Sequence, residues 1–515
     1  MMIETRKENL PPADVDTGSG ADTGAAAKAI AEIDTDTAPL AGDMAPLASE
    51  PVPPDAADRL GSEPVGRLLL RFSAPAITGM LVNALYNVVD RIFVGRGVGE
   101  TALGGLTLVM PLMTAVMAFA LLIGVGTANL ISMRLGQRRR PEAERALNHC
   151  FWLLLGAGIL VMIAGLLFLE PLLALLSAQE DSAAIFYARG YIKVILYGSV
   201  FWLMSFGLSH CARAQGFPAV SMGSMLIGTG MNCVLDPLFI FVFHWGVEGA
   251  ALATVISWLA STVWILAFSL SKRAIISLRP LAHKFALPMA RQIFLFGAAQ
   301  FFLQLAVAFV QAVYNGSVSV YGAIELGGAN GGDVALSGMN ILHSIMTLIL
   351  MPIFGINQGA QPILGYNYGA KKFARVLRAY IYAVLAATVV SSGGFLLSHI
   401  YPEGIVDLFA PNGSAALLAF APKAIRTYTL ALPLVGFQIV SANMFVVTGR
   451  PKTSLLLSMT RQLILLIPCI LLFGWLGGLN GVLWATPTAD SLSILLTALL
   501  IIRELRVLRR AASAL

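Results

Sequence analysis

Windows of about 20 apolar residues recur along this chain from residue 68 to its end, and each can cross a bilayer as a helix. The composition agrees, because 57% of the residues are hydrophobic and 12% are charged, against about 45–50% and about 25% in soluble domains. We therefore expect an all-α polytopic membrane protein. Its twelve transmembrane helices are expected at roughly 67–94, 103–133, 147–169, 185–213, 218–243, 248–271, 289–320, 334–360, 377–400, 419–447, 453–475 and 480–502.

The first 64 residues have a different character from the rest of the chain. They hold thirteen acidic residues against four basic ones and almost no aromatic side chains. Such a segment cannot bury enough apolar surface to order itself, so residues 1–64 are predicted to be a disordered acidic tail. They contain no apolar stretch typical of a signal peptide, and the first span is expected to insert the protein.

Basic residues gather in alternate loops between the predicted spans. Examples are Arg138 to Arg140 after the second span and Lys371 and Lys372 after the eighth, whereas the opposite loops hold few such residues. By the positive-inside rule both chain termini are expected in the cytoplasm. Four further basic residues that flank two short turns are assigned to the same side: Arg213, Arg450, Lys452 and Arg461.

The sequence also repeats weakly. Gly216-Phe217-Pro218 recurs as Gly449-Arg450-Pro451, and three other glycine-containing matches fall at nearly the same offset. Six spans in each repeat give two pseudo-symmetric six-helix lobes of the same orientation, with a cavity between them as in transporters. The predicted division is an N-lobe at 65–271, a cytoplasmic linker at 272–288, a C-lobe at 289–505 and a basic C-terminal tail at 506–515.

Two polar residues four apart in the fifth span, Asn232 and Asp236, share one helix face. Counting 1.5 Å per residue from the outer loops places Asp90, Asp236 and Thr254 about 10–12 Å below the outer surface. Together these four side chains offer two carboxylates, an amide and a hydroxyl, all hard oxygen ligands for H⁺ or Na⁺. Ionisable groups at this depth cost about 2.5–3.5 kcal/mol and indicate function. Pro237 frees a backbone carbonyl beside them.

Structural explanations compete with this cation site. Asp90 lies next to Arg91, and the two could form an interfacial ion pair. Asp236 before Pro237 could mark a kink, and Asn232 could hydrogen-bond to a neighbouring helix.

Other polar residues in the spans are weaker candidates for a substrate cavity. Gln300, Gln304 and Gln311 form one stripe on the seventh span, which serves equally well for helix packing. Asp490 is the one deeply placed acid of the second lobe, and a structural hydrogen bond is the preferred interpretation. The four cysteines have no paired spacing, so neither a disulfide framework nor a cysteine metal site is indicated.

Four stretches together resemble the multidrug and toxic compound extrusion (MATE) family, and they span most of the chain after the acidic tail: residues 81–95, 232–237, 246–254 and 351–372. The resemblance implies the fold of the MATE and MOP superfamily. The cation-site pattern of the bacterial DinF-like, multidrug-exporting branch falls on Asp90, Asn232, Asp236 and Thr254. Another branch carries acids in spans seven and ten, where this sequence has none. Asn87, in the first stretch, is a further cavity candidate.

The function implied by the resemblance is secondary active multidrug efflux. Organic cations would leave the cell in exchange for inward H⁺ or Na⁺ by alternating access, with the two acids titrating as a coupled pair. The expected setting is the bacterial cytoplasmic (inner) membrane. The partners are expected to be small-molecule organic cations and membrane lipids, with no nucleic acid, and the protein is expected to be a monomer without a cofactor besides the coupling ion.

Three other functions compete with efflux. A flippase for lipid-linked saccharides, from the same superfamily, should line its cavity with basic residues, whereas nearly all Lys and Arg here fall in loops. A membrane enzyme should carry a catalytic motif, and no HExxH or GxSxG is found. A membrane scaffold would depend on its acidic tail, so that deletion of residues 1–60 would abolish its function.

Overall fold

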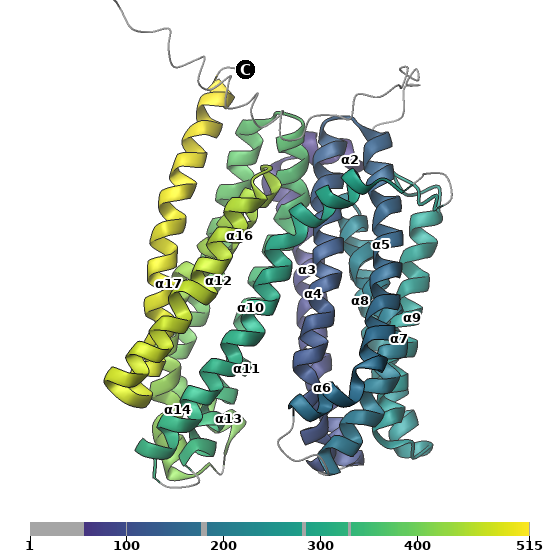
Figure 1. Cartoon of the computed structure of the whole chain (residues 1–515). Helices are drawn as coiled ribbons and strands as arrows, with labels where there is room; N and C mark the ends of the chain where they lie inside the picture. The colour runs from purple at the N-terminus through teal and green to yellow at the C-terminus, as the bar shows by residue number, and fades with distance from the viewer. Residues whose placement is uncertain are drawn as a thin grey trace, which may run out of the picture.

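The structure is a computed structural model that describes residues 56–98, 100–176, 183–280, 285–327, 331–411 and 413–513. These residues form a bundle of long helices that run roughly side by side, without a strand among them (Figure 1). The first half comprises α2 (Ala56–Ser62), α3 (Val65–Gly97), α4 (Glu100–Gly136), α5 (Arg140–Leu167), α6 (Leu169–Leu176), α7 (Ala183–Ala214), α8 (Pro218–Pro237), the π-helix η1 (Leu238–Val242) and α9 (Gly246–Leu270).

The second half repeats this order of long helices. It comprises α10 (Leu287–Glu325), α11 (Gly331–Gly369), α12 (Phe373–Ile400), α13 (Pro402–Phe409), α14 (Ala415–Tyr428), α15 (Leu432–Val447), α16 (Pro451–Met459), the π-helix η2 (Thr460–Leu466) and α17 (Ile467–Ser513).

The number of membrane crossings follows from two irregular places. Ten helices among the described residues are long and apolar enough to cross a bilayer, and α14 and α15 form an eleventh span that is bent by 47°. The tenth is a 63-residue stretch that is broken at Gly477 and Gly478, where the chain reverses direction (Figure 1). Gly478 has a φ of 57°, which glycine adopts without strain. Counting this stretch as two spans gives twelve, and the predicted fold class is confirmed.

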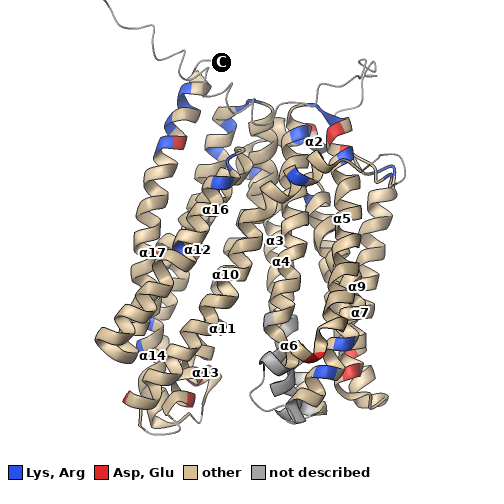
Figure 2. Cartoon of the chain, viewed as in Figure 1, with Lys and Arg blue, Asp and Glu red and all other residues tan. Residues whose placement is uncertain are grey.

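Lys and Arg residues lie mostly toward the end of the bundle where α17 ends, as Figure 2 shows. The assignment of Arg461 to this end was wrong. Arg461 lies in η2, about 15 Å into the span that begins at Pro451. Its guanidinium is paired at 2.7 Å with the carboxylate of Asp490 on α17, and this ion pair is what permits a charge so deep in the bundle.

The two halves meet backbone to backbone between α4 and α10, in the part of these helices nearer the basic end of the bundle. At Gly126 of α4 and Gly297 of α10, an added Cβ would overlap carbonyl oxygens of the opposite helix, those of Ile293 and Leu122 respectively. The helices can therefore touch backbone to backbone only because these two positions have no side chain, as is common between membrane helices.

The segment expected to be a disordered tail contains one ordered helix at its end. In α2, the Leu60 side chain is fully buried, and its carbonyl accepts hydrogen bonds from Asn367 and Arg375. Lys372 donates to the carbonyl of Gly61. These bonds satisfy the C-terminal carbonyls of α2, which have no partner within the helix. They explain why residues 56–62 are helical although the sequence predicted disorder. Residues 1–55 lie outside the described part of the chain.

The connection between the halves is held against the first half. The backbone N–H of Arg279 donates to Asn148 at 2.7 Å, and that of Ala286 donates to the His149 ring at 2.8 Å. The backbone N–H of Ile276 donates to Gln215. Within its described residues, this connection therefore has fixed partners on α5 and beside α7.

Candidate functional site

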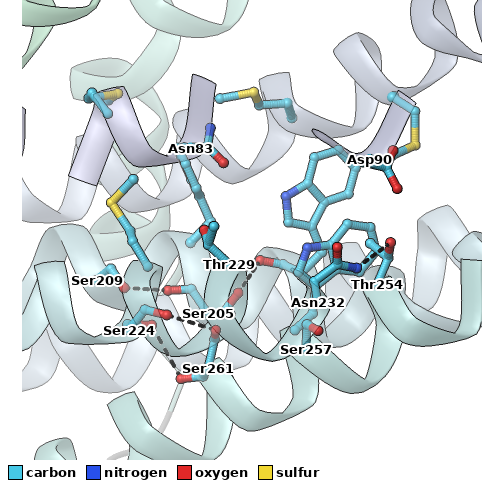
Figure 3. Close-up of a pocket in the computed structure, with 18 of the residues that line it drawn as sticks. Asn83, Asp90, Ser205, Ser209, Ser224, Thr229, Asn232, Thr254, Ser257 and Ser261 are labelled. Carbon is cyan, nitrogen blue, oxygen red and sulfur yellow. Dashed lines mark hydrogen bonds between the residues drawn. The ribbon is translucent and has the colours of Figure 1, made fainter. Parts of the chain in front are cut away.

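A cavity of about 340 Å³ lies in the first half and is lined by residues of α3, α4, α7, α8 and α9 (Figure 3). One residue of the second half, Gln358 of α11, also lines it. Its volume falls in the range of small-molecule binding sites, about 300–1,000 Å³. Among the described lining residues, Asp90 is the one carboxylate and Arg213 the one guanidinium.

The end of the cavity next to Asp90 gathers the polar residues that the sequence singles out. The Asn232 amide on α8 donates a hydrogen bond to the Thr254 hydroxyl on α9 at 3.1 Å, and Thr254 in turn donates to the carbonyl of Ala250. Asp90 on α3 lies across from this pair in Figure 3. The hydrogen bond from the amide nitrogen to Thr254 fixes the plane of the Asn232 amide. It therefore also fixes the direction of the amide oxygen.

Asp236 lies one helical turn beyond Asn232 and is fully buried. Its carboxylate is close enough to interact electrostatically with Asp90 and Asn232. Neither carboxylate oxygen of Asp236, nor the Asn232 Oδ1, makes a hydrogen bond of regular geometry to another described residue. Buried polar oxygens rarely lack such partners, so these three oxygens are available to a ligand that carries positive charge.

The four predicted residues Asp90, Asn232, Asp236 and Thr254 therefore come together from three helices. Their oxygens form a hard-ligand set of the kind that suits a proton or an alkali cation. No group of three or more His, Cys, Asp or Glu side chains within the described residues resembles a transition-metal site.

The backbone next to this layer is irregular. Pro237 ends α8 and is followed directly by η1, a five-residue π-helix. Proline lacks the N–H that would bond to the carbonyl of Cys233, and π-helical turns are frequent at functional sites. The proline therefore marks a change of helix type rather than an end of the span.

The middle of the cavity has features that the sequence did not single out. Trp202 and Trp258 stack face to face, with ring centroids 4.8 Å apart. Hydroxyl groups from α7, α8 and α9 form one side of the cavity, and methionines form much of the other. The hydroxyl residues are Ser205, Ser209, Ser224, Thr229, Ser257 and Ser261, and the methionines are Met80, Met110, Met113, Met117 and Met225. The i, i+4 spacings of Ser205 with Ser209 and of Ser257 with Ser261 were the available signals.

The opposite end of the cavity is basic. Arg213, at the last turn of α7, is buried and donates hydrogen bonds to Gln358 and, at 3.0 Å, to Ser221. His210 lies one turn earlier, with its ring in edge contact with Phe206. The sequence placed Arg213 beside a cytoplasmic turn, and the structure places it at that end of the bundle but directed into the cavity.

The other candidates whose side chains the structure describes do not line this cavity. Gln300 and Gln304 of α10 are half-buried and Gln311 is exposed. Asp490 lies in the second half, paired with Arg461. Asn87 belongs to α3, but its side chain lies outside the described residues.

Comparison with known proteins gives consistent matches. A family model described as MatE matches residues 75–238 and 324–471. The multidrug export protein MepA of Staphylococcus aureus strain NCTC 8325 is 27% identical over 446 residues, which make up 86% of this chain and 94% of that protein. The protein of the same name from Staphylococcus haemolyticus is 24% identical over 440 residues, or 85% of this chain and 94% of that protein.

Solved structures of similar shape cover nearly the whole described chain. The MATE multidrug transporter DinF-BH, solved in complex with R6G, matches with a TM-score of 0.80 and 33% identity, over 88% of this chain and 98% of that one. An outward-facing multidrug resistance MATE transporter of the MOP superfamily matches with a TM-score of 0.81 and 25% identity, over 90% and 100% of the two chains.

Proposed function

The chain belongs to the multidrug and toxic compound extrusion (MATE) family, and from this premise we propose that it is a secondary active multidrug efflux transporter. In this proposal it moves amphipathic organic cations out of the cell in exchange for inward H⁺ or Na⁺. The names of its relatives, multidrug export proteins and MATE multidrug transporters, support this assignment.

One observation carries the coupling proposal, namely the three unsatisfied oxygens of Asp236 and Asn232 buried beside Asp90. Two neighbouring carboxylates take up protons as a coupled pair, and the same oxygens, with Thr254, offer ligands to Na⁺. Cation binding would remove the repulsion between the two acids and satisfy the buried oxygens at once.

Coupling requires that the cation bind one state of the transporter more tightly than the other. The contacts at Gly126 and Gly297 near the basic end support assigning the present arrangement to a state closed to the cytoplasm. In that state the cation enters from outside, and its binding shifts the two halves toward the arrangement that opens inward. Drug binding from the cytoplasm then accompanies release of the cation.

The cavity suits the proposed substrate class. An aromatic stack of Trp202 and Trp258 attracts organic cations over the ring faces. Methionines adapt their shape to ligands of different outline, which favours a broad substrate range. A flippase for lipid-linked saccharides would hold pyrophosphate with several basic groups, and the described lining offers one guanidinium, that of Arg213.

The proposed setting is the bacterial cytoplasmic membrane, with both chain termini in the cytoplasm and the protein acting as a monomer. The gathering of Lys and Arg at the end of the bundle where α17 ends supports this orientation (Figure 2).

The experiment that tests the proposal is export of ethidium by cells that produce Asp236→Asn. This variant keeps the shape of the side chain but removes the charge that binds the cation. We expect export to fall to the level of cells without the transporter, while the amount of protein in the membrane is unchanged.

The matched control is Asp407→Asn, an exposed acid on α13, which should export ethidium like the unmodified protein. Export by Asp236→Asn at the control level would contradict the assignment of the cation site. Absence of export by the unmodified protein would contradict the efflux function itself.

A further inference from the structure

We propose that the acidic segment 1–55 of this chain binds a basic platform at the end of the bundle where α17 ends, and thereby restrains the separation of the two halves there (Figure 2). The platform is a surface that the efflux proposal does not use. It consists of two turns and the helix starts that follow them, with the residues Arg138, Arg140, Lys371, Lys372, Arg375 and Arg378.

The two turns of the platform belong to different halves and lie next to each other. One joins α4 to α5, and the other joins α11 to α12, the corresponding helices of the second half. An added Cβ at Gly136 would overlap the carbonyl oxygen of Tyr366, and one at Gly369 would overlap that of Met133. The ends of α4 and α11 therefore meet backbone to backbone, and the platform crosses the boundary between the halves.

A basic residue stands in each turn where the backbone favours glycine. Arg138 and Lys371 have φ angles of 60° and 57°, a region in which a side chain is strained. The ends of α7 and α15 show the same hydrogen-bond pattern, but there the position is held by Gly216 and Gly449. The positive-inside rule explains basic residues at this end of the bundle, but it does not require them at strained positions.

Much of the platform's charge has no counter-ion within the described residues. Arg138, Lys371 and Arg378 are exposed, and none of the three forms an ion pair with a described carboxylate. Arg139, in the same turn as Arg138, is by contrast paired with Glu142. The platform is therefore a surface of uncompensated positive charge that suits an acidic ligand.

The acidic segment joins the described chain at the platform itself. Residues 1–55 hold eleven acidic residues against three basic ones, and α2 follows them directly. Lys372 and Arg375 of the platform donate to the carbonyls of Gly61 and Leu60 at the end of α2. Because the segment is attached at this point, its effective concentration at the platform is high. Charge and attachment together favour it over a separate acidic partner.

Binding of the segment would extend a contact between the halves that α2 already makes. α2 leads into α3 of the first half, but its Leu60 carbonyl accepts hydrogen bonds from Asn367 and Arg375 of the second half. A segment bound to both turns would hold them together, and they would have to separate for this end of the bundle to open. Salt should weaken such a contact, since the Debye length falls from about 10 Å at 0.1 M to about 3 Å at 1 M.

The test is cross-linking of the purified full-length protein with a water-soluble carbodiimide, which joins carboxylates to lysine amines that touch them. Cross-linked peptides are identified by mass spectrometry in phosphatidylcholine vesicles. We expect Lys371 to be joined to acids of residues 1–55, and Lys272, an exposed lysine at the same end of the bundle, to give few such products. Most of the Lys371 products should be lost at about 1 M salt.

Two double variants with the same change of net charge separate the platform from the general charge of this end. Arg138→Gln with Arg378→Gln keeps Lys371 as the acceptor and should lose most of its cross-links. Arg273→Gln with Arg506→Gln changes two exposed arginines outside the platform and should cross-link like the unmodified protein.

The restraint is tested by ethidium transport of a full-length variant in which the eleven acids of residues 1–55 are replaced by Asn or Gln. This variant should transport faster than the unmodified protein at low salt and equally fast at high salt. Equal rates at low salt would overturn the restraint.

Three results would overturn the binding itself, and none of them depends on the efflux function. The first is equal cross-linking of Lys371 and Lys272, and the second is full cross-linking of Lys371 in Arg138→Gln with Arg378→Gln. The third is loss of the Lys371 products when phosphatidylglycerol replaces phosphatidylcholine, which would assign the platform to anionic lipid headgroups.

Discussion

The hydrogen bond from Asn232 to Thr254 orients one oxygen of the proposed cation site. Because the amide nitrogen is engaged, its oxygen is directed away from Thr254 and remains without a described partner. The hydroxyl of Thr254 is also satisfied by the carbonyl of Ala250. In the proposed cation site, Thr254 would thus act through the orientation of Asn232 as well as through its own lone pair.

Replacement of Thr254 by Val tests this arrangement. Valine has nearly the same shape, but it leaves the buried Asn232 N–H without an acceptor, which costs about 1–3 kcal/mol. We expect a lower melting temperature in detergent and a weaker stabilisation by added Na⁺ or H⁺ than in the unmodified protein.

The control is Thr347→Val, because Thr347 makes the same kind of bond to its own helix at an exposed position. The free energy of unfolding of that variant should lie within about 0.5 kcal/mol of the value for the unmodified protein. Equal destabilisation by both variants would show that the Asn232 contact has no special role.

Sequence reasoning reached these residues because charge and spacing are visible in an apolar helix. Asn232 and Asp236 stand four apart without another charge nearby, and Thr254 was found by counting depth. Sequence reasoning failed for Arg461 because the distance of a residue from a turn does not reveal which side chain of another helix lies opposite it. An arginine ten residues inside a span is tolerated only when a partner such as Asp490 lies on another helix.

At the scale of elements, the ion pair between η2 and α17 joins two neighbouring spans of the second half. Asp490 is 5% exposed, and its oxygen receives the Arg461 Nε–H at 2.7 Å. Breaking a buried pair by removing one partner is costly because the other charge stays buried, whereas removing both is often nearly neutral.

We therefore expect Asp490→Asn to lower the free energy of unfolding by about 3–5 kcal/mol. The double variant Arg461→Gln with Asp490→Asn should recover most of this loss, as measured by thermal unfolding in detergent. A double variant less stable than Asp490→Asn would contradict the interpretation of this pair as structural.

The predicted elements agree with the observed ones where apolar runs are long and fail where a span is interrupted. The tenth predicted span, 419–447, is two helices, α14 and α15, with a bend of 47° between them. The fifth changes to a π-helix after Pro237. Hydropathy shows that a segment crosses the membrane, but the local backbone depends on which neighbouring groups satisfy the freed carbonyls.

At the scale of the whole molecule, the two halves repeat one plan but differ in charge. In the first half Asp236 lies beside Asp90, and neither carboxylate oxygen of Asp236 has a hydrogen-bond partner of regular geometry among the described residues. The second half holds an acid that Arg461 already neutralises. The similarity of helix order is what the sequence repeat predicted, and the difference arises from single residues that the repeat does not preserve.

This asymmetry leads to the central claim, that the first half alone couples export to the cation gradient. Cation binding can drive the exchange only where the cation binds one state more tightly than the other. A carboxylate already paired with a fixed guanidinium has little to gain from a second cation.

The most direct test is ethidium transport by proteoliposomes under separately imposed pH and Na⁺ gradients. Three proteins are compared: the unmodified chain, Asp236→Asn, and the double variant Arg461→Gln with Asp490→Asn. The account predicts that at least one gradient drives the unmodified protein and the double variant, and that neither gradient drives Asp236→Asn. Gradient-driven transport by Asp236→Asn together with its loss in the double variant would contradict the account and move the coupling site to the second half.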